Sequence, residues 1–230
     1  MDQAAIRLFT HSIQLGMYDP DVEYRTWGPE VVDTPDHRAL ALTAAHQAIV
    51  LLKNDGGLLP VAPKKTLAVI GPHATATQDM LSNYYGTNTL VNSHSPLAAL
   101  QARASWPVTY SAGLPSIEST DISGFAAAAA AAKSCDVAIV FVGIHQAQES
   151  EGLDRINITL PGAQEALVAA VLAANPNTVV VLINGGPLAI DRLQITVPAI
   201  VEAFYPGELG GDAIADVLLG VVSPAGQIPT

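Results

Sequence analysis

Four short apolar runs, each closed by a glycine or a Pro-Gly turn, constrain the fold more than any other feature of the sequence. They are KTLAVIGP, CDVAIVFVG, NTVVVLINGG and PAIVEAFYPG. Uninterrupted apolar runs of this length are typical of strands that are covered on both faces. Helical stretches lie between or after them near 121–133, 163–174 and 209–220. This alternation predicts an α/β fold, a three-layer sandwich in which helices flank a mostly parallel central sheet.

The segment before the first run carries a helix start signal. Thr34 is a candidate N-cap and Pro35 suits the first helical position. The apolar periodicity continues through Leu52 and then meets the turn sequence Asn54-Asp55-Gly56-Gly57. We therefore expect one helix from Pro35 to Leu52.

Composition narrows the class of protein. The chain has 230 residues, of which 50% are hydrophobic and 13% are charged, so a large core can form. The formal net charge of −11, with scattered Lys and Arg, argues against a nucleic-acid partner. The apolar runs are too short for a membrane span, and the N-terminal segment lacks the pattern of a signal peptide. The chain is thus expected either not to be exported or to be part of a longer protein.

Motifs for cofactors and metals are missing from the sequence. Neither a dinucleotide-binding nor a phosphate-binding glycine motif follows any expected strand, and no G-x-S-x-G elbow occurs. Cys135 is the only cysteine, and the spacing of the histidines does not predict a metal site. We expect no cofactor and no metal.

Polar residues follow the expected strands at their carboxyl ends. These residues form the segments 71–73, 143–155, 184–187 and 205–208. In a parallel sheet such loops meet at one edge, where ligands bind. Glu149, Glu151, Asp154 and Arg155 should therefore face a cleft.

Six ordered segments carry a family resemblance. From Leu15 onward the chain resembles glycoside hydrolase family 3, and in particular its β-xylosidase-like branch. The segments are LGMYDP, GPEVVDTPDHRALALTAAHQAIVLLKNDGGLLPV, LAVIGPHATATQDMLSNYYG, ESEGLDRINITLPGAQEALV, VVVLINGGPLAI and AFYPGELGGDAIADVLLGVVSPAGQIP.

The resemblance implies a domain organisation. In this family an N-terminal β/α barrel carries a nucleophilic Asp, and a following α/β sandwich supplies the acid/base Glu. Residues 1–38 resemble the end of such a barrel and its linker, and residues 39–230 resemble the sandwich, truncated at its C-terminal end. The implied partners are the barrel, which this chain lacks, and an oligosaccharide or an aryl or alkyl β-glycoside. Localisation is unknown from this chain, whereas a secreted full-length parent is expected.

The resemblance also implies roles for the loop residues. Glu151 aligns with the family pattern E-G-x-D-R as the general acid/base, and Glu149 is the alternative. Retaining glycosidases need this second carboxylate to protonate the leaving oxygen and then to activate water. Asp154 and Arg155 are expected to form a structural pair that fixes the loop.

Three further expectations remain. Tyr84 and Tyr85 resemble a position where relatives place a ring near the substrate, although at least one of the two is expected to belong to the core. Asn157 begins a glycosylation sequon, which matters only in a secreted parent. Two functions are therefore expected: the chain is the part of a glycosidase that supplies the acid/base, or it is a catalytically inactive fragment that at most binds sugar. A flavodoxin-like module is a third hypothesis, based on fold alone.

Overall fold

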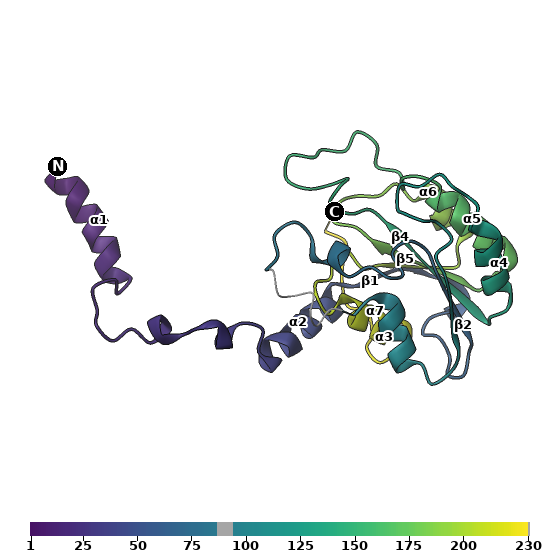
Figure 1. Ribbon diagram of the computed structural model, residues 1–230, viewed down its shortest axis with the longest axis horizontal. Coiled ribbons are helices and arrows are strands. Elements are labelled where there is room, and N and C mark those ends of the chain that lie inside the picture. Colours follow the sequence, from purple (N-terminus) through teal and green to yellow (C-terminus); the bar gives the residue numbers. More distant parts are fainter. Residues whose placement is uncertain (87–93, 230) are drawn as a thin grey trace. The chain divides into compact units, whose positions relative to one another are not determined.

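The computed structural model describes residues 1–86 and 94–229, which divide into two compact units, Met1–Arg38 and Ala39–Thr230. The first unit contains helix α1 (Asp2–Gln14) and the 3-10 turns Glu23–Thr26 and Pro29–Val31. None of the residues in these three elements is buried. The second unit contains the sheet and its covering helices (Figure 1). What residues 1–38 pack against in a longer protein stays a prediction.

The second unit is built on a six-stranded sheet with the order β1-β6-β5-β4-β2-β3. Its strands are β1 (Val50–Asn54), β2 (Leu67–Ile70), β3 (Val108–Ser111), β4 (Val137–Gly143), β5 (Thr178–Ile183) and β6 (Ala199–Glu202). All neighbouring pairs are parallel except β1 with β6. The expected mostly parallel α/β sheet is therefore confirmed.

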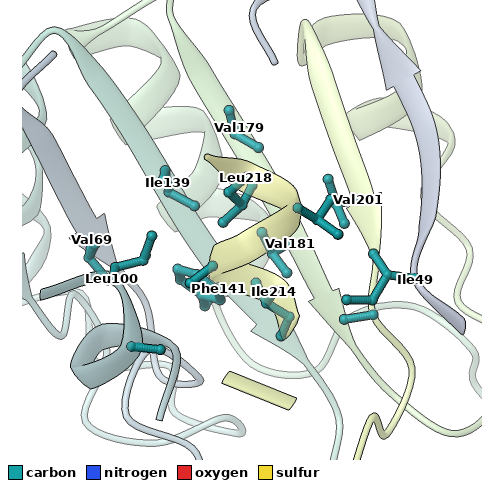
Figure 2. Packing of buried hydrophobic residues seen from close by; sticks show 14 of the residues in the cluster. Ile49, Val69, Leu100, Ile139, Phe141, Val179, Val181, Val201, Ile214 and Leu218 are labelled. Carbon is teal, nitrogen blue, oxygen red and sulfur yellow. The ribbon is translucent and has the colours of Figure 1, made fainter. Parts of the chain in front are cut away.

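Helices cover both faces of the sheet (Figure 1). One face packs against α4 (Phe125–Lys133), α5 (Gln164–Ala174) and α6 (Asp191–Thr196). The other packs against α3 (Pro96–Arg103), α7 (Gly210–Leu218) and the end of α2 (Pro35–Ala48). Figure 2 shows Ile214 and Leu218 of α7 lying over Val181 and Phe141 of the sheet.

The continuous apolar run of β4 follows from this layering. Ile139 and Phe141 contribute to the core on the α7 side, whereas Ala138 and Val140 contribute to the core on the α5 side. Because successive side chains point to opposite faces, a strand between two helical layers has no solvent-facing position to fill with polar residues.

The helix expected from Pro35 to Leu52 is wrong at its C-terminal end. Thr34 does cap the start, because its Oγ1 accepts a hydrogen bond from the His37 amide at 3.3 Å. The helix ends at Ala48, and Val50–Asn54 forms β1, which pairs antiparallel with β6. This pairing uses the backbone groups of β1 that face β6, and local periodicity does not reveal it. The elements β3, α3 and α6 lie outside those expected from the sequence.

No helix of the described part of the chain is long and apolar enough to cross a membrane.

Candidate functional site

The loops after β2, β4, β5 and β6 meet at the carboxyl edge of the sheet, as predicted. The side-chain Nε2 of Gln146 donates to the Asp79 backbone carbonyl at 3.1 Å, which joins the loops after β4 and β2. The Gly207 amide donates to the Met80 carbonyl at 2.9 Å, which joins the loops after β6 and β2. These two hydrogen bonds join the loops after β2, β4 and β6 at the carboxyl edge of the sheet.

Glycine at two positions allows these loops to pack closely. Gly143, at the end of β4, has a φ of +151°, and a Cβ there would lie 1.9 Å from the Ile183 carbonyl oxygen. A Cβ on Gly186 would lie 2.4 Å from Oε2 of Glu149. A side chain at Gly186 would therefore displace the Glu149 carboxylate from the turn after β5.

Glu149 is fixed in the interior of the edge. Its Oε1 accepts a hydrogen bond from the Gly185 amide at 2.5 Å, and its Oε2 lies 3.7 Å from Nη2 of Arg155. Only 15% of its side chain is exposed. Burial, together with a hydrogen bond to Glu149, raises the pKa of Tyr205. The carboxylate of Glu149 thus links the loops after β4, β5 and β6.

Glu151 has the opposite environment. It lies exposed in a tight turn in which the Leu153 amide donates to the Ser150 carbonyl at 2.9 Å. The Tyr84 hydroxyl donates a hydrogen bond to its Oε2, and this bond raises the pKa of Tyr84. The two candidate glutamates therefore differ: one holds the loop and the other is presented from it.

The two tyrosines lie on the surface, so the expectation that at least one belongs to the core is wrong. Tyr84 is 77% exposed and Tyr85 is 39% exposed. The Tyr85 hydroxyl accepts a hydrogen bond from Nε2 of Gln78 at 2.5 Å. The two tyrosines follow a short 3-10 turn, Gln78–Leu81. In this turn the side chains of Met80 and Leu81 are buried.

The structural pair is made differently from the expected one. Arg155 lies beside Glu149, and its Nη2 donates to the Pro187 carbonyl at 2.5 Å. Asp154 is exposed, and no hydrogen bond or ion pair joins it to the residues that the structure describes. Arg155 therefore has Glu149 and the turn after β5 as its partners, and the expected pair with Asp154 is not formed.

A histidine-carboxylate cluster supports the base of the β4–α5 loop. Nε2 of His145 lies 2.5 Å from Glu118 and its Nδ1 lies 3.6 Å from Asp79. The carbonyl of His145 accepts from the Glu149 amide at 3.1 Å. His73 is fully buried behind the cluster, 3.8 Å from Asp79, and burial lowers the pKa of His73 to about 4.

A buried carboxyl lies at the end of β6. Glu202 is 7% exposed, and its Oε1 accepts from the Phe204 amide at 2.9 Å. Burial raises its pKa to about 7, while the hydrogen bonds with Phe204 and Asn184 act in the opposite direction. Glu202 and the cluster around His145 were not expected from the sequence, although a carboxyl inside an apolar strand, as at Glu202, is a usable signal.

Within the described ranges, no group of three or more His, Cys, Asp or Glu residues is arranged to hold a metal ion.

Comparison with known proteins gives one family. The model of the glycosyl hydrolase family 3 C-terminal domain matches residues 49–230. The chain is 39% identical to beta-D-xylosidase 1 of Arabidopsis thaliana, over 98% of this chain and 30% of that protein. It is 40% identical to beta-xylosidase/alpha-L-arabinofuranosidase 1 of Medicago sativa subsp. varia, over 96% of this chain and 29% of that protein. The chain thus spans under a third of the length of these relatives.

Two solved structures of glycosidases have folds similar to that of this chain. A family 3 exo-beta-xylosidase in complex with a xylobiose aziridine activity-based probe superposes with a TM-score of 0.86 at 36% identity, over 96% of this chain and 29% of that one. A beta-glucosidase from Listeria innocua in complex with isofagomine gives 0.87 at 27% identity, over 97% of this chain and 31% of that one.

Proposed function

Because the chain belongs to glycosyl hydrolase family 3, we propose that it is the sandwich part of a retaining β-xylosidase- or β-glucosidase-like hydrolase and supplies the general acid/base, Glu151. The observation that carries this proposal is the loop after β4, which presents one exposed carboxylate from a rigidly held base. An exposed carboxylate on a fixed loop suits a group that must first donate a proton and later accept one.

The chemistry needs a second carboxylate from outside this chain. In a retaining mechanism a nucleophile attacks the anomeric carbon while Glu151 protonates the departing glycosidic oxygen. Glu151 then takes a proton from the water that releases the sugar. The family resemblance assigns that nucleophile to a barrel, so we expect the chain by itself to hydrolyse no aryl β-xyloside or β-glucoside.

The contacts favour Glu151 over Glu149. Both oxygens of Glu149 face protein partners, the Gly185 amide and the Arg155 guanidinium. A carboxylate whose two oxygens are turned toward protein partners is poorly placed to reach a glycosidic oxygen. Glu151 is bonded only by the exposed Tyr84 hydroxyl among the described residues. We infer that Tyr84 orients Glu151 and that Tyr85 lies beside the substrate.

The test joins this chain to the barrel of a family 3 xylosidase and compares Glu151→Ala with Glu149→Ala. In Glu151→Ala, hydrolysis of a poor-leaving-group xyloside should fall by about 100-fold or more, because proton transfer contributes about that much. An activated aryl xyloside should be affected less at the glycosylation step.

Azide provides the decisive control. It needs no general base, so it should restore turnover of the activated substrate in Glu151→Ala and yield a glycosyl azide of retained configuration. If azide rescues Glu149→Ala and leaves Glu151→Ala unchanged, Glu149 is the acid/base.

A second candidate follows from the coverage of the relatives, of which this chain spans about 30%. A chain that is never joined to a barrel would be a catalytically inactive fragment, at most binding sugar. Hydrolysis by the chain alone, abolished by Glu151→Gln, would contradict this candidate and the requirement for a barrel together. We further propose an extracellular parent, which detection of the protein in culture medium tests.

A further inference from the structure

A cavity of about 440 Å³ lies at the carboxyl ends of β5 and β6, beside the turn that contacts Glu149. This volume falls within the usual range for small-molecule sites. Most of its wall is apolar and includes Leu52, Leu188, Ile190 and Phe204.

Two buried polar side chains lie at one end of the cavity. Asn184 is 2% exposed, and its Nδ2 donates to the Gly186 carbonyl at 3.0 Å. Its Oδ1 is buried and has no hydrogen-bond partner within the part of the chain that the structure describes. Glu202 lies in the same wall and is 7% exposed. A buried acceptor without a donor is costly, so this end of the cavity favours a ligand that donates a hydrogen bond.

The charges of the wall select against ions. Glu202 repels an anion when ionised. Lys53 also lines the cavity, where its Nζ donates to the Gln194 carbonyl at 2.7 Å and lies 3.1 Å from Asp55. Its positive charge disfavours a cation there, and burial raises the pKa of Glu202 to about 7, so that its charge is partly removed at neutral pH.

The balance of polar and apolar surface selects among neutral ligands. A free sugar has several hydroxyl groups that each need a partner, and an apolar wall leaves most of them unpaired. A ligand with one hydroxyl group and a hydrocarbon body matches the polar end and the apolar wall together.

We propose that this cavity binds a small neutral aryl or alkyl alcohol, with its hydroxyl group donating to Oδ1 of Asn184 and its hydrocarbon body against Leu188, Ile190 and Phe204. An alcohol of this class is also what hydrolysis of an aryl or alkyl glycoside releases. The inference rests on the proposed function only in naming the alcohol as a product, and the binding itself needs no catalysis.

The test titrates the whole chain with benzyl alcohol and follows backbone amide shifts by NMR. Saturable shifts should be confined to residues around Asn184, Leu188 and Glu202. Toluene, which has the same ring and no hydroxyl group, should bind about twofold to tenfold more weakly, the range expected for one neutral hydrogen bond. Benzylamine and xylose should bind more weakly than benzyl alcohol.

Matched variants locate the site. Ile190 and Leu172 are both half-buried and pack against the same core, but Leu172 lines a different cavity, on α5. Ile190→Trp should fill the proposed site and abolish the shifts, whereas Leu172→Trp should leave the affinity within about twofold. Asn184→Leu should lower the affinity for benzyl alcohol to that for toluene and leave toluene unaffected. If Asn184→Leu does not fold, the two Trp variants still decide the outcome.

Four results would overturn the proposal: no saturable binding of benzyl alcohol, equal binding of toluene, tighter binding of benzylamine or xylose, or loss of binding in Leu172→Trp but not in Ile190→Trp. None of them bears on whether Glu151 is the acid/base, because binding is measured on this chain without turnover. Conversely, failure of the Glu151 test leaves the titration untouched.

Discussion

Replacing Glu202 by Gln should stabilise the protein at alkaline pH and have little effect in acid. Burial raises the pKa of Glu202 from 4.5 to about 7, so the folded state holds a proton that the unfolded state has already lost between these values. Over that interval the free energy of unfolding falls as pH rises, because the folded state binds more protons than the unfolded one. Below about pH 4.5 both states are protonated and the effect is absent.

The size of the effect follows from the shift. One pKa unit corresponds to roughly 1.4 kcal/mol, so a rise from 4.5 to about 7 costs about 3 kcal/mol once both states are ionised. Between about pH 5.5 and about pH 8.5 the expected change is about 2 kcal/mol. Glu202 is 7% exposed, so solvent screening reduces this value little.

Urea unfolding at these two pH values measures the difference directly. Glu202→Gln should gain about 2 kcal/mol relative to the wild type on going from the lower to the higher pH. Glu165→Gln, on the half-exposed start of α5, is the control for removing one negative charge from an acidic chain. If Glu202→Gln and Glu165→Gln show the same pH dependence as the wild type, Glu202 does not hold a proton in the folded state.

Three further predictions concern the loop, the cluster and the first unit. Burial lowers the pKa of His73 from 6.5 to about 4, so the folded state should lose about 3 kcal/mol as pH falls through that interval, and His73→Gln should remove this loss in urea titrations. Glu149→Gln should lower stability by about 1 to 2 kcal/mol, since it weakens charge-assisted contacts with Arg155 and a backbone amide, whereas Glu151→Gln should change stability by under about 0.5 kcal/mol in the same assay. The purified chain should bind a hydrophobic dye and aggregate, and deletion of residues 1–38 should reduce both, because the apolar side chains of α1 are exposed; equal dye binding by the two chains would refute this.

The sequence predicted the central strands well because their burial on both faces leaves a local signature. The run Val137–Gly143 is buried and apolar at every position, whereas α7, which is also buried throughout, carries the polar residues Asp212 and Asp216. The edge strand Val50–Asn54 differs, because four of its five residues are only half-buried. Its apolar residues continue the helical periodicity of α2, and only the antiparallel pairing with β6 distinguishes the two conformations. The strand conformation of Val50–Asn54 is therefore determined by its tertiary pairing with β6 and not by the local sequence pattern.

The same distinction applies to the site. The loop with Glu149 and Glu151 could be placed from sequence because it follows a buried strand, and the carboxyl ends of parallel strands share one edge. The partner of Arg155 could not, because Glu149 is six residues away and Asp154 is adjacent. Likewise, nothing local marks Asn184 as a buried acceptor, since its environment is made by the loop after β5 and by β6.

The two glutamates acquire different roles from one turn. The Glu149 amide donates to the His145 carbonyl, and its carboxylate reaches the Gly185 amide across the edge, where the absence of a Cβ at Gly186 leaves room for it. Two positions later the chain has turned outward, and Gly152, with a φ of +79°, closes the turn that exposes Glu151. A carboxylate whose oxygens face an amide and a guanidinium is turned away from solvent, whereas one that is exposed and bonded by a single hydroxyl is accessible to a ligand. The contacts that fix Glu149 are therefore what allows Glu151 to be presented at a defined place.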